Sequence, residues 1–209
     1  MKRPLLLFSL TAALALGVGV VAVQAEDDDS GGGEHHETIA CLSATGGDDE
    51  AEDQGEANDA GEVEGTEGDD DIQGTEANDE IDGNQGDDEL EGEQGDDDVC
   101  GDADDDDISG EAGDDELDGG PGDDRLSGGT GDDVLRGDSG RDLLLGGPGN
   151  DRISGGRGRD RIRAGSGNDR INVRGDHRHD RVNCGRGFDR VRADRKDRIA
   201  RNCERVRRS

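Results

Sequence analysis

Aliphatic residues recur along the middle of the chain with a fixed period of nine. Each is Val, Ile or Leu, and the run passes through thirteen positions without a slip: Val63, Ile72, Ile81, Leu90, Val99, Ile108, Leu117, Leu126, Leu135, Leu144, Ile153, Ile162 and Ile171. A nine-residue period matches no face of an α-helix. The three residues centred on each aliphatic instead predict a short β-strand with one side chain directed inward.

Aspartate and glycine hold fixed positions between the aliphatics. The first position of a row is Gly in eleven of twelve rows, with Ala164 as the exception, and the fourth is Gly in ten, with Ala77 and Asp104 as exceptions. Glycine permits the positive-φ turns that join such strands. The sixth position is aspartate in all twelve rows: Asp70, Asp79, Asp88, Asp97, Asp106, Asp115, Asp124, Asp133, Asp142, Asp151, Asp160 and Asp169.

One row cannot bury its aliphatic alone, but stacked rows form a continuous thin core. Two rows make an eighteen-residue coil with a strand on each side, so the pattern predicts an all-β, two-sheet solenoid. Each aspartate then lies above the aspartate two rows later, and such a carboxylate column repels itself. Ca²⁺ accepts six to eight oxygens from carboxylates and backbone carbonyls. The sixth-position aspartates are therefore predicted to be calcium ligands.

The rows resemble the nonapeptide repeats of hemolysin-type (RTX) calcium-binding proteins. The segments GGPGDDRLS, GGTGDDVLR, GGPGNDRIS and GGRGRDRIR, within residues 119–163, match that pattern closely. The resemblance implies a right-handed parallel β-roll with Ca²⁺ held by the sixth-position Asp and turn carbonyls of rows n and n+2. Twelve turns would give at most ten ions. In size and leader the chain is similar to small exported bacterial repeat proteins.

The composition indicates that a hydrophobic core alone cannot stabilise the fold. The formal net charge is -32, aromatics are 1%, and hydrophobic residues are 27%. Such a chain cannot bury enough apolar surface to offset its ordering entropy. We expect the acidic rows to be disordered without Ca²⁺. A permanently disordered acidic tail is the alternative, and it leaves the strict register of the aliphatics unexplained.

The termini differ in composition from the repeat. Residues 1–25 are predicted to be a cleaved secretory signal peptide, because Lys2 and Arg3 precede an apolar run and small residues end it at Ala25; an uncleaved membrane anchor is the alternative. Residues 26–62 are predicted to be an acidic linker or N-terminal cap, 63–172 the repeat roll, and 173–209 an Arg-rich C-terminal cap of degenerate rows.

Four cysteines in an exported chain predict two disulfides, for which three connectivities exist. Local pairing joins Cys184 to Cys203 within the cap, and Cys41 to Cys100 between the entry segment and the roll. No CxxC spacing occurs, which argues against a zinc site.

The second half of the chain changes sign. Residues 26–124 hold 43 acidic residues and no Lys or Arg, whereas residues 125–209 hold 22 basic and 13 acidic residues. Arginines such as Arg125 and Arg161 should point outward from strands. They form a solvated edge, a surface for an anionic partner such as a cell-surface or matrix polymer, or a contact between acidic and basic ends. Nucleic acid is disfavoured, because no aromatics are interleaved for base stacking.

The sequence contains no set of nucleophile, base and orienting group in a pocket-forming context. The leading interpretation is a secreted, non-enzymatic calcium-binding protein with a structural or interaction role outside the cell or at its surface. The alternative is an adhesin-like module that holds an anionic partner through its Arg-rich half.

Overall fold

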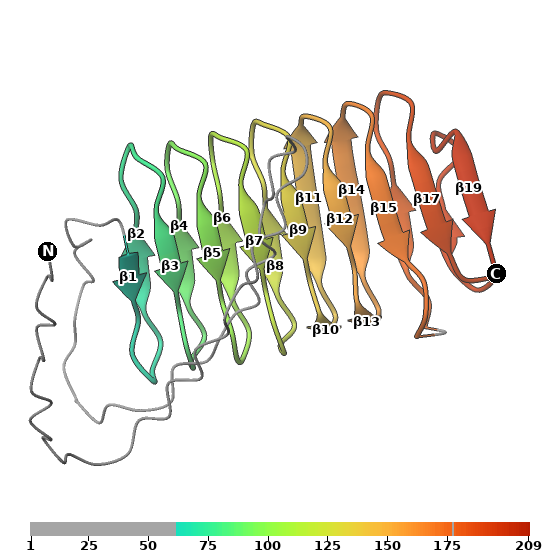
Figure 1. The fold of residues 1–209 in the computed structure, drawn as a ribbon. Helices are drawn as coiled ribbons and strands as arrows, with labels where there is room; N and C mark the ends of the chain where they lie inside the picture. The colour runs from blue at the N-terminus through green and yellow to red at the C-terminus, as the bar shows by residue number, and fades with distance from the viewer. Residues whose placement is uncertain (1–61, 177) are drawn as a thin grey trace, which may run out of the picture. The chain divides into compact units, whose positions relative to one another are not determined.

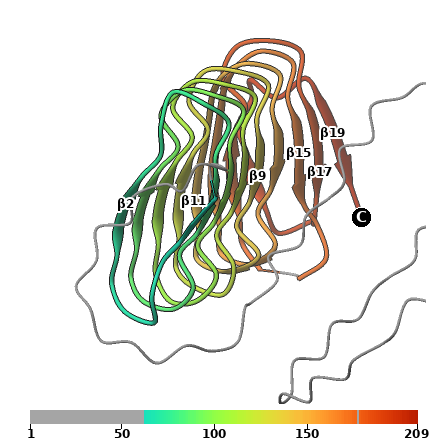
Figure 2. The same ribbon diagram turned by 60° about the vertical axis from the view of Figure 1, so that its left-hand side comes forward.

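The computed structural model describes residues 62–209 apart from 177, and these form a parallel β-roll that contains no helix. The coils lie one behind another along a single axis, with a strand on each side of every coil (Figure 1, Figure 2). The predicted all-β solenoid is confirmed. None of the described residues forms a helix long and apolar enough to cross a membrane. The predicted signal peptide and most of the predicted linker lie outside the described residues.

One side of the roll is a nine-stranded parallel sheet, called sheet A here. Its strands in spatial order are β1 (Glu62–Glu64), β3 (Glu80–Asp82), β5 (Asp98–Cys100), β7 (Glu116–Asp118), β9 (Val134–Arg136), β12 (Arg152–Ser154), β15 (Arg170–Val173), β17 (Arg190–Ala193) and β19 (Arg205–Arg208). Only every second row of the chain contributes a strand to it, because each coil of two rows has one strand on each side.

The other side is an eight-stranded parallel sheet, called sheet B here. Its strands in spatial order are β2 (Asp71–Gln73), β4 (Glu89–Glu91), β6 (Asp107–Ser109), β8 (Arg125–Ser127), β11 (Leu143–Pro148), β14 (Arg161–Ser166), β16 (Arg181–Asn183) and β18 (Arg198–Ile199). Two short strands in the turns, β10 (Ser139–Gly140) and β13 (Arg157–Gly158), pair with each other.

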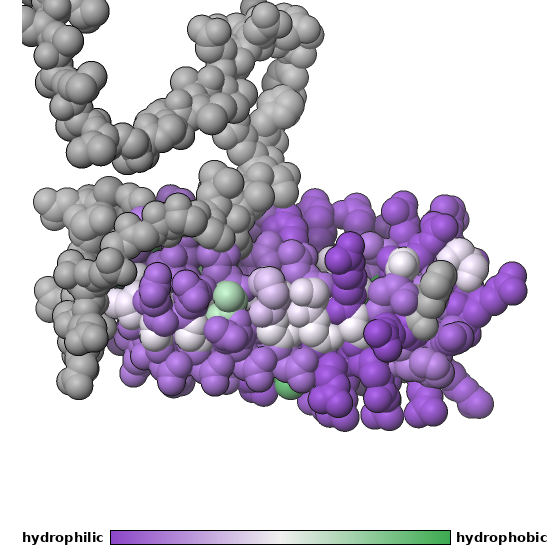
Figure 3. Space-filling view, turned by 90° about the horizontal axis from the view of Figure 1, so that it is seen from below, coloured by the Kyte–Doolittle hydropathy of each residue, from purple (hydrophilic) through white to green (hydrophobic). Residues whose placement is uncertain are grey.

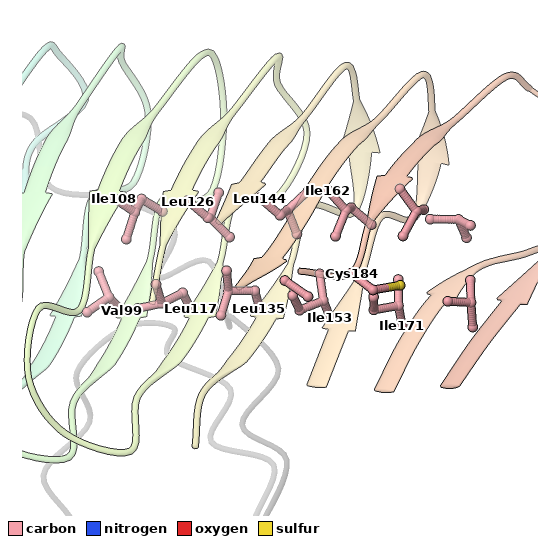
Figure 4. Close-up of a cluster of buried hydrophobic side chains, with 14 of the residues drawn as sticks. Val99, Ile108, Leu117, Leu126, Leu135, Leu144, Ile153, Ile162, Ile171 and Cys184 are labelled. Carbon is pink, nitrogen blue, oxygen red and sulfur yellow. The ribbon is translucent and has the colours of Figure 1, made fainter. Parts of the chain in front are cut away.

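The repeat sets the register of both sheets. Ile108 pairs with Leu126 one coil later, and Leu117 pairs with Leu135, so partners are eighteen residues apart. Two facing rows of aliphatics fill the space between the sheets (Figure 4). All thirteen predicted aliphatics are buried, none more than 4% exposed. Each contributes about 2 kcal/mol by burial, which is small beside the entropy of ordering the nine residues of its row.

The outside of the roll is hydrophilic, as one long face shows (Figure 3). Strand residues alternate outward, inward, outward, so the central residue of a three-residue strand is buried, and in β2 both of its neighbours are exposed. Phe188 and Val206 are the only large hydrophobic side chains exposed among the described residues.

The last rows continue the same two sheets despite their irregular spacing. Arg161 pairs with Arg181 and Arg170 with Arg190, a separation of twenty residues that absorbs the two-residue delay before Asp180. The division of the chain at residue 172 stays a prediction, since the sheets cross it without a break.

One predicted disulfide is present in these rows. Cys184 and Cys203 are bonded, with an S–S distance of 2.04 Å, and both lie in the buried core. Cys100, on β5, is also disulfide-bonded. Its predicted partner, Cys41, lies outside the described residues, so that pairing stays a prediction.

Candidate metal centre

The twelve sixth-position aspartates form two stacked columns, one along each edge of the roll where a turn enters a strand. Each precedes its strand directly, so the strand register places successive aspartates of a column one coil apart. Asp70, in the first row, is half-buried, and the other eleven are no more than 4% exposed. The structure therefore brings together all the side chains that the sequence predicted as ligands.

A chain of hydrogen bonds holds one oxygen of every carboxylate. The backbone N–H of Asp70 donates to Asp88 Oδ1 at 2.8 Å, and the N–H of Asp88 donates in turn to Asp106 Oδ1 at 3.0 Å. The same bond links every sixth-position aspartate to the one a coil later. Beyond the twelve rows the ladder continues through Asp180, Asp189, Asp197 and Glu204.

The second oxygen of most of these carboxylates has no partner. Oδ2 is buried without a hydrogen bond in ten of the twelve predicted ligands, Asp88 through Asp169, and also in Asp189. An isolated buried anion is strongly disfavoured, and buried charges are normally paired or bound to a metal. An unpartnered column of this length needs counter-charge.

The pKa values express this cost. Burial is the largest cause and raises the pKa of Asp124 to about 7 and that of Asp142 to about 8, although the donated backbone N–H opposes the shift. Neighbouring carboxylates raise these pKa values further. The same cause raises the pKa to about 7 in Asp106, Asp115, Asp151 and Asp160.

Glycine at the first position leaves room beside the unpartnered oxygen in nine of these ten rows, the exception being Ala164 in the row of Asp169. A Cβ added at Gly83 would lie 2.5 Å from Asp88 Oδ2 and 3.0 Å from the carbonyl oxygen of Gly101, which begins the row one coil later. The carboxylate of one row and a carbonyl of the next coil therefore border the same small space. A side chain at this position would fill it.

The turns present further carbonyl oxygens to their neighbours. A Cβ added at Gly131 or Gly140 would overlap the fourth-position carbonyl oxygen of Gly113 or Gly122, one coil earlier. Neither of these two carbonyls accepts a backbone hydrogen bond from the described residues. The fourth-position oxygens of Gly113 and Gly122 are thus directed at the following turn and are available as ligands, whereas that of Gly140 accepts the N–H of Arg159 at 3.2 Å.

This donor set fits calcium. Within residues 62–209, residue 177 apart, no three His, Cys, Asp or Glu side chains cluster as a metal site. The oxygens that border the space at Gly83 are Oδ2 of Asp88 and the carbonyl oxygen of Gly101, a mixed set of carboxylate and backbone carbonyl. Ca²⁺ accepts such mixed sets of six to eight oxygens, whereas Mg²⁺ requires a near-ideal octahedron. The ten sixth-position aspartates from Asp88 to Asp169, whose Oδ2 is unpartnered, and the turn carbonyls of adjacent coils would hold it.

The first two rows differ from the rest. Thr66 donates its N–H to Asp70 Oδ2 at 2.6 Å and its hydroxyl to the same oxygen at 3.1 Å. Thr75 makes the same two bonds to Asp79 Oδ2, at 2.6 and 3.0 Å. These carboxylates are satisfied by protein donors, as befits the first turns of a stack.

The first two rows also differ from the others in the backbone conformation of their second residue. In the other ten rows the second residue has a positive φ, even where it is Glu93, Asp102 or Glu111. Thr66 and Thr75 do not, in keeping with the steric penalty for β-branched residues there. The second position therefore decides whether the Oδ2 of its row is capped by the protein or left open.

A second ladder, which the sequence reasoning did not assign, runs along the exposed turns. The fifth-position side chain accepts an N–H from the residue one coil later: the N–H of Asp105 donates to Asp87 Oδ1 at 3.1 Å, opposite in direction to the sixth-position ladder. The sequence carries a signal for this ladder, since the fifth position is Asp or Asn in ten of twelve rows and Arg only in Arg141 and Arg159.

Comparison with known proteins agrees with this geometry. The family model of the RTX calcium-binding nonapeptide repeat (HemolysinCabind) matches four times, over residues 64–99, 101–135, 118–153 and 136–171. No curated protein matches the chain. The four matches together span about half of the sequence and coincide with the stacked turns, so the chain belongs to the RTX calcium-binding nonapeptide repeat family.

Proposed function

We propose that this protein is a secreted, non-enzymatic calcium-binding protein whose β-roll folds when several Ca²⁺ ions bind between its stacked turns. Its role would be structural or interactive, outside the cell or at its surface. Membership of the RTX family implies a calcium-binding β-roll. The proposal goes further than family membership in the calcium ligands, the export and the coupling of folding to binding.

One observation carries the proposal: the unpartnered Oδ2 atoms from Asp88 to Asp169. Bound Ca²⁺ would supply the missing charge, and it would cross-link each turn to the next coil through the carboxylate and carbonyl oxygens. Because the unfolded chain has no such preformed site, the free energy of binding becomes free energy of folding. We therefore expect binding and folding to be one cooperative transition.

Export follows the same logic. A site of millimolar affinity would stay empty where Ca²⁺ is scarce and fill where it is abundant, as extracellular calcium modules do. The chain would remain loose during transport and become ordered outside. The bond between Cys184 and Cys203 is consistent with an oxidising compartment.

A calcium titration of the full mature chain, followed by circular dichroism, tests the proposal. We expect a disordered spectrum in chelator and a cooperative gain of β signal on adding Ca²⁺, with Mg²⁺ far less effective. Spectra that are alike in chelator and in abundant calcium, whether folded or unfolded, would refute the coupling of folding to calcium.

A further inference from the structure

The outer face of sheet B carries a column of charges that reverses sign halfway. The first residues of its eight strands lie in register along the roll, and all are exposed except the half-buried Leu143. In spatial order they are Asp71, Glu89, Asp107, Arg125, Leu143, Arg161, Arg181 and Arg198. Three acids stand at one end and three arginines at the other.

The basic end is not neutralised within the described part of the chain. Arg125 pairs with Asp107 at 3.2 Å, but none of the three ion pairs found in residues 62–209 involves Arg161, Arg181 or Arg198. Neighbouring strands are only about 4.8 Å apart, and like charges directly opposite one another destabilise a sheet. The acidic end has the same conflict between Asp71 and Glu89.

We propose that sheet B is a self-complementary surface on which a second copy of this chain docks with its roll axis reversed. A two-fold axis parallel to the strands, between β8 and β11, places Asp107 opposite Arg161 of the second copy and Glu89 opposite Arg181 of the second copy. Asp71 then faces Arg198 of the second copy. The same three contacts recur by symmetry, as an isologous interface requires.

The centre of this face is mixed in character. Leu143 and Leu145, both half-buried, project from β11 beside the proposed axis, and Arg125 and Ser127 project from β8. Arg125 would face Leu143 of the second copy and keep its ion pair with Asp107 of its own chain. Sheet A is less suitable, because the disulfide-bonded Cys100 lies on its acidic half.

The area of the outer face of sheet B limits the affinity of the proposed dimer. Eight strands at about 4.8 Å and three residues of about 3.3 Å give roughly 400 Å² per copy, about half of a standard interface. The dimer is therefore weak and dominated by charge. It requires the folded, calcium-loaded roll, since only the folded roll aligns the column.

Sedimentation of the full chain in saturating Ca²⁺ tests this surface. At about 0.1 M salt, where the Debye length is about 10 Å, we expect reversible dimers, and at about 1 M salt, where it is about 3 Å, monomers. The double variant Arg161→Glu, Arg181→Glu should weaken association more than about tenfold, as should Glu89→Arg, Asp107→Arg. Mixing the two variants should restore a dimer, because their opposing charges are complementary again.

The matched control is Arg170→Glu, Arg190→Glu, which changes the same strand position on sheet A and should leave the dimer intact. Circular dichroism in Ca²⁺ confirms that each variant is folded, which separates a failure of docking from a failure of calcium-driven folding. A folded wild-type roll that stays monomeric at every concentration overturns the proposal. So does a control variant that disrupts association as strongly, or a monomer that binds a sulfated polymer through Arg161 and Arg181.

Discussion

The backbone N–H of Asp124 donates a hydrogen bond of 3.2 Å to Oδ1 of Asp142, one coil later. This bond fixes the carboxylate of Asp142 and leaves its Oδ2 buried without a partner. The carboxylate of Asp142 thus joins two coils by accepting this N–H through Oδ1, and its Oδ2 is available to a cation. The repeat of this relationship along the roll explains why folding and calcium binding should be inseparable.

Replacing Asp142 with Asn should separate the two roles of this side chain, which are to accept the N–H of Asp124 and to bind a cation. The amide oxygen can still accept the N–H of Asp124, but the NH₂ group cannot bind a cation. We expect a less cooperative calcium transition and a loss of about 2 kcal/mol in the free energy of unfolding at saturating Ca²⁺, the usual worth of an interaction with a charged group. Denaturant unfolding in calcium measures this loss.

The matched control is Arg125→Gln, a change to a residue whose ion pair with Asp107 is exposed on both sides. Exposed pairs contribute about 0–1 kcal/mol. A variant at Asp142 with wild-type cooperativity and stability would show that its Oδ2 holds no ion.

The strands and the two aspartate columns could be predicted from sequence because each depends on a strict period. A nine-residue spacing with one aliphatic per row leaves few folds in which Leu126 and Leu144 can both be buried. The direction of the aspartate hydrogen bonds could not be predicted, because it depends on backbone orientation in the turn. Nor could the continuation of sheet A to Arg208 and of sheet B to Ile199, since the late rows lose most of their glycines and their regular spacing.

Lowering the pH should substitute for calcium in part. Burial raises the pKa of Asp142 from 3.8 to about 8 and that of Asp124 from 3.8 to about 7. Between pH 3.8 and these raised values, the folded roll therefore binds more protons than the unfolded chain. A raised pKa of an acid gives stability that is present below the unfolded value and lost as pH rises through the folded value. The ion-free roll is therefore most stable in acid.

Circular dichroism in chelator, from alkaline pH to below 3.8, checks this expectation, with sedimentation velocity to distinguish a folded monomer from aggregates. We expect β signal to grow as the pH falls through about 8 to 6 and beyond, and calcium affinity to fall over the same window because protons compete for the carboxylates. An apo chain that gains structure only at alkaline pH would contradict the assignment.

Thr75 should control the number of bound ions. Its N–H and hydroxyl occupy Oδ2 of Asp79, which in later rows is unpartnered. Replacing Thr75 with Gly removes the hydroxyl and permits the positive φ found at the second position of later rows. We expect Asp79 to become a ligand and the calcium stoichiometry to increase, as measured by equilibrium dialysis.

Thr130→Gly is the control for this change, because Thr130 occupies the exposed third position of its row and donates only its backbone N–H, to the Glu111 carbonyl, at 2.8 Å. Its stoichiometry should equal that of the wild type. An unchanged ion count in Thr75→Gly would mean that the second position does not decide occupancy.

The sequence could not show that the Thr rows differ, because Thr66 and Thr75 occupy a position where the other rows vary freely among Asn, Glu, Asp and Gly. The distinction is a matter of φ, and φ is set by the turn rather than by hydrophobic period. In the same way, Glu93 and Glu111 adopt a left-handed conformation that their residue type disfavours. The stacking of adjacent turns overrides local preference at these positions.

Removing the bond between Cys184 and Cys203 should destabilise the C-terminal coils selectively. The two cysteines are nineteen residues apart and close a loop across β17 and β18, for which the chain-entropy model gives about 3 kcal/mol. In Cys184→Ser, Cys203→Ser we expect faster hydrogen exchange in β16 to β19 in saturating Ca²⁺, while β6 to β9, far along the roll, keep wild-type protection, because each coil contacts only its neighbours. Equal loss of protection in both regions would instead show that the bond stabilises coils far beyond its own.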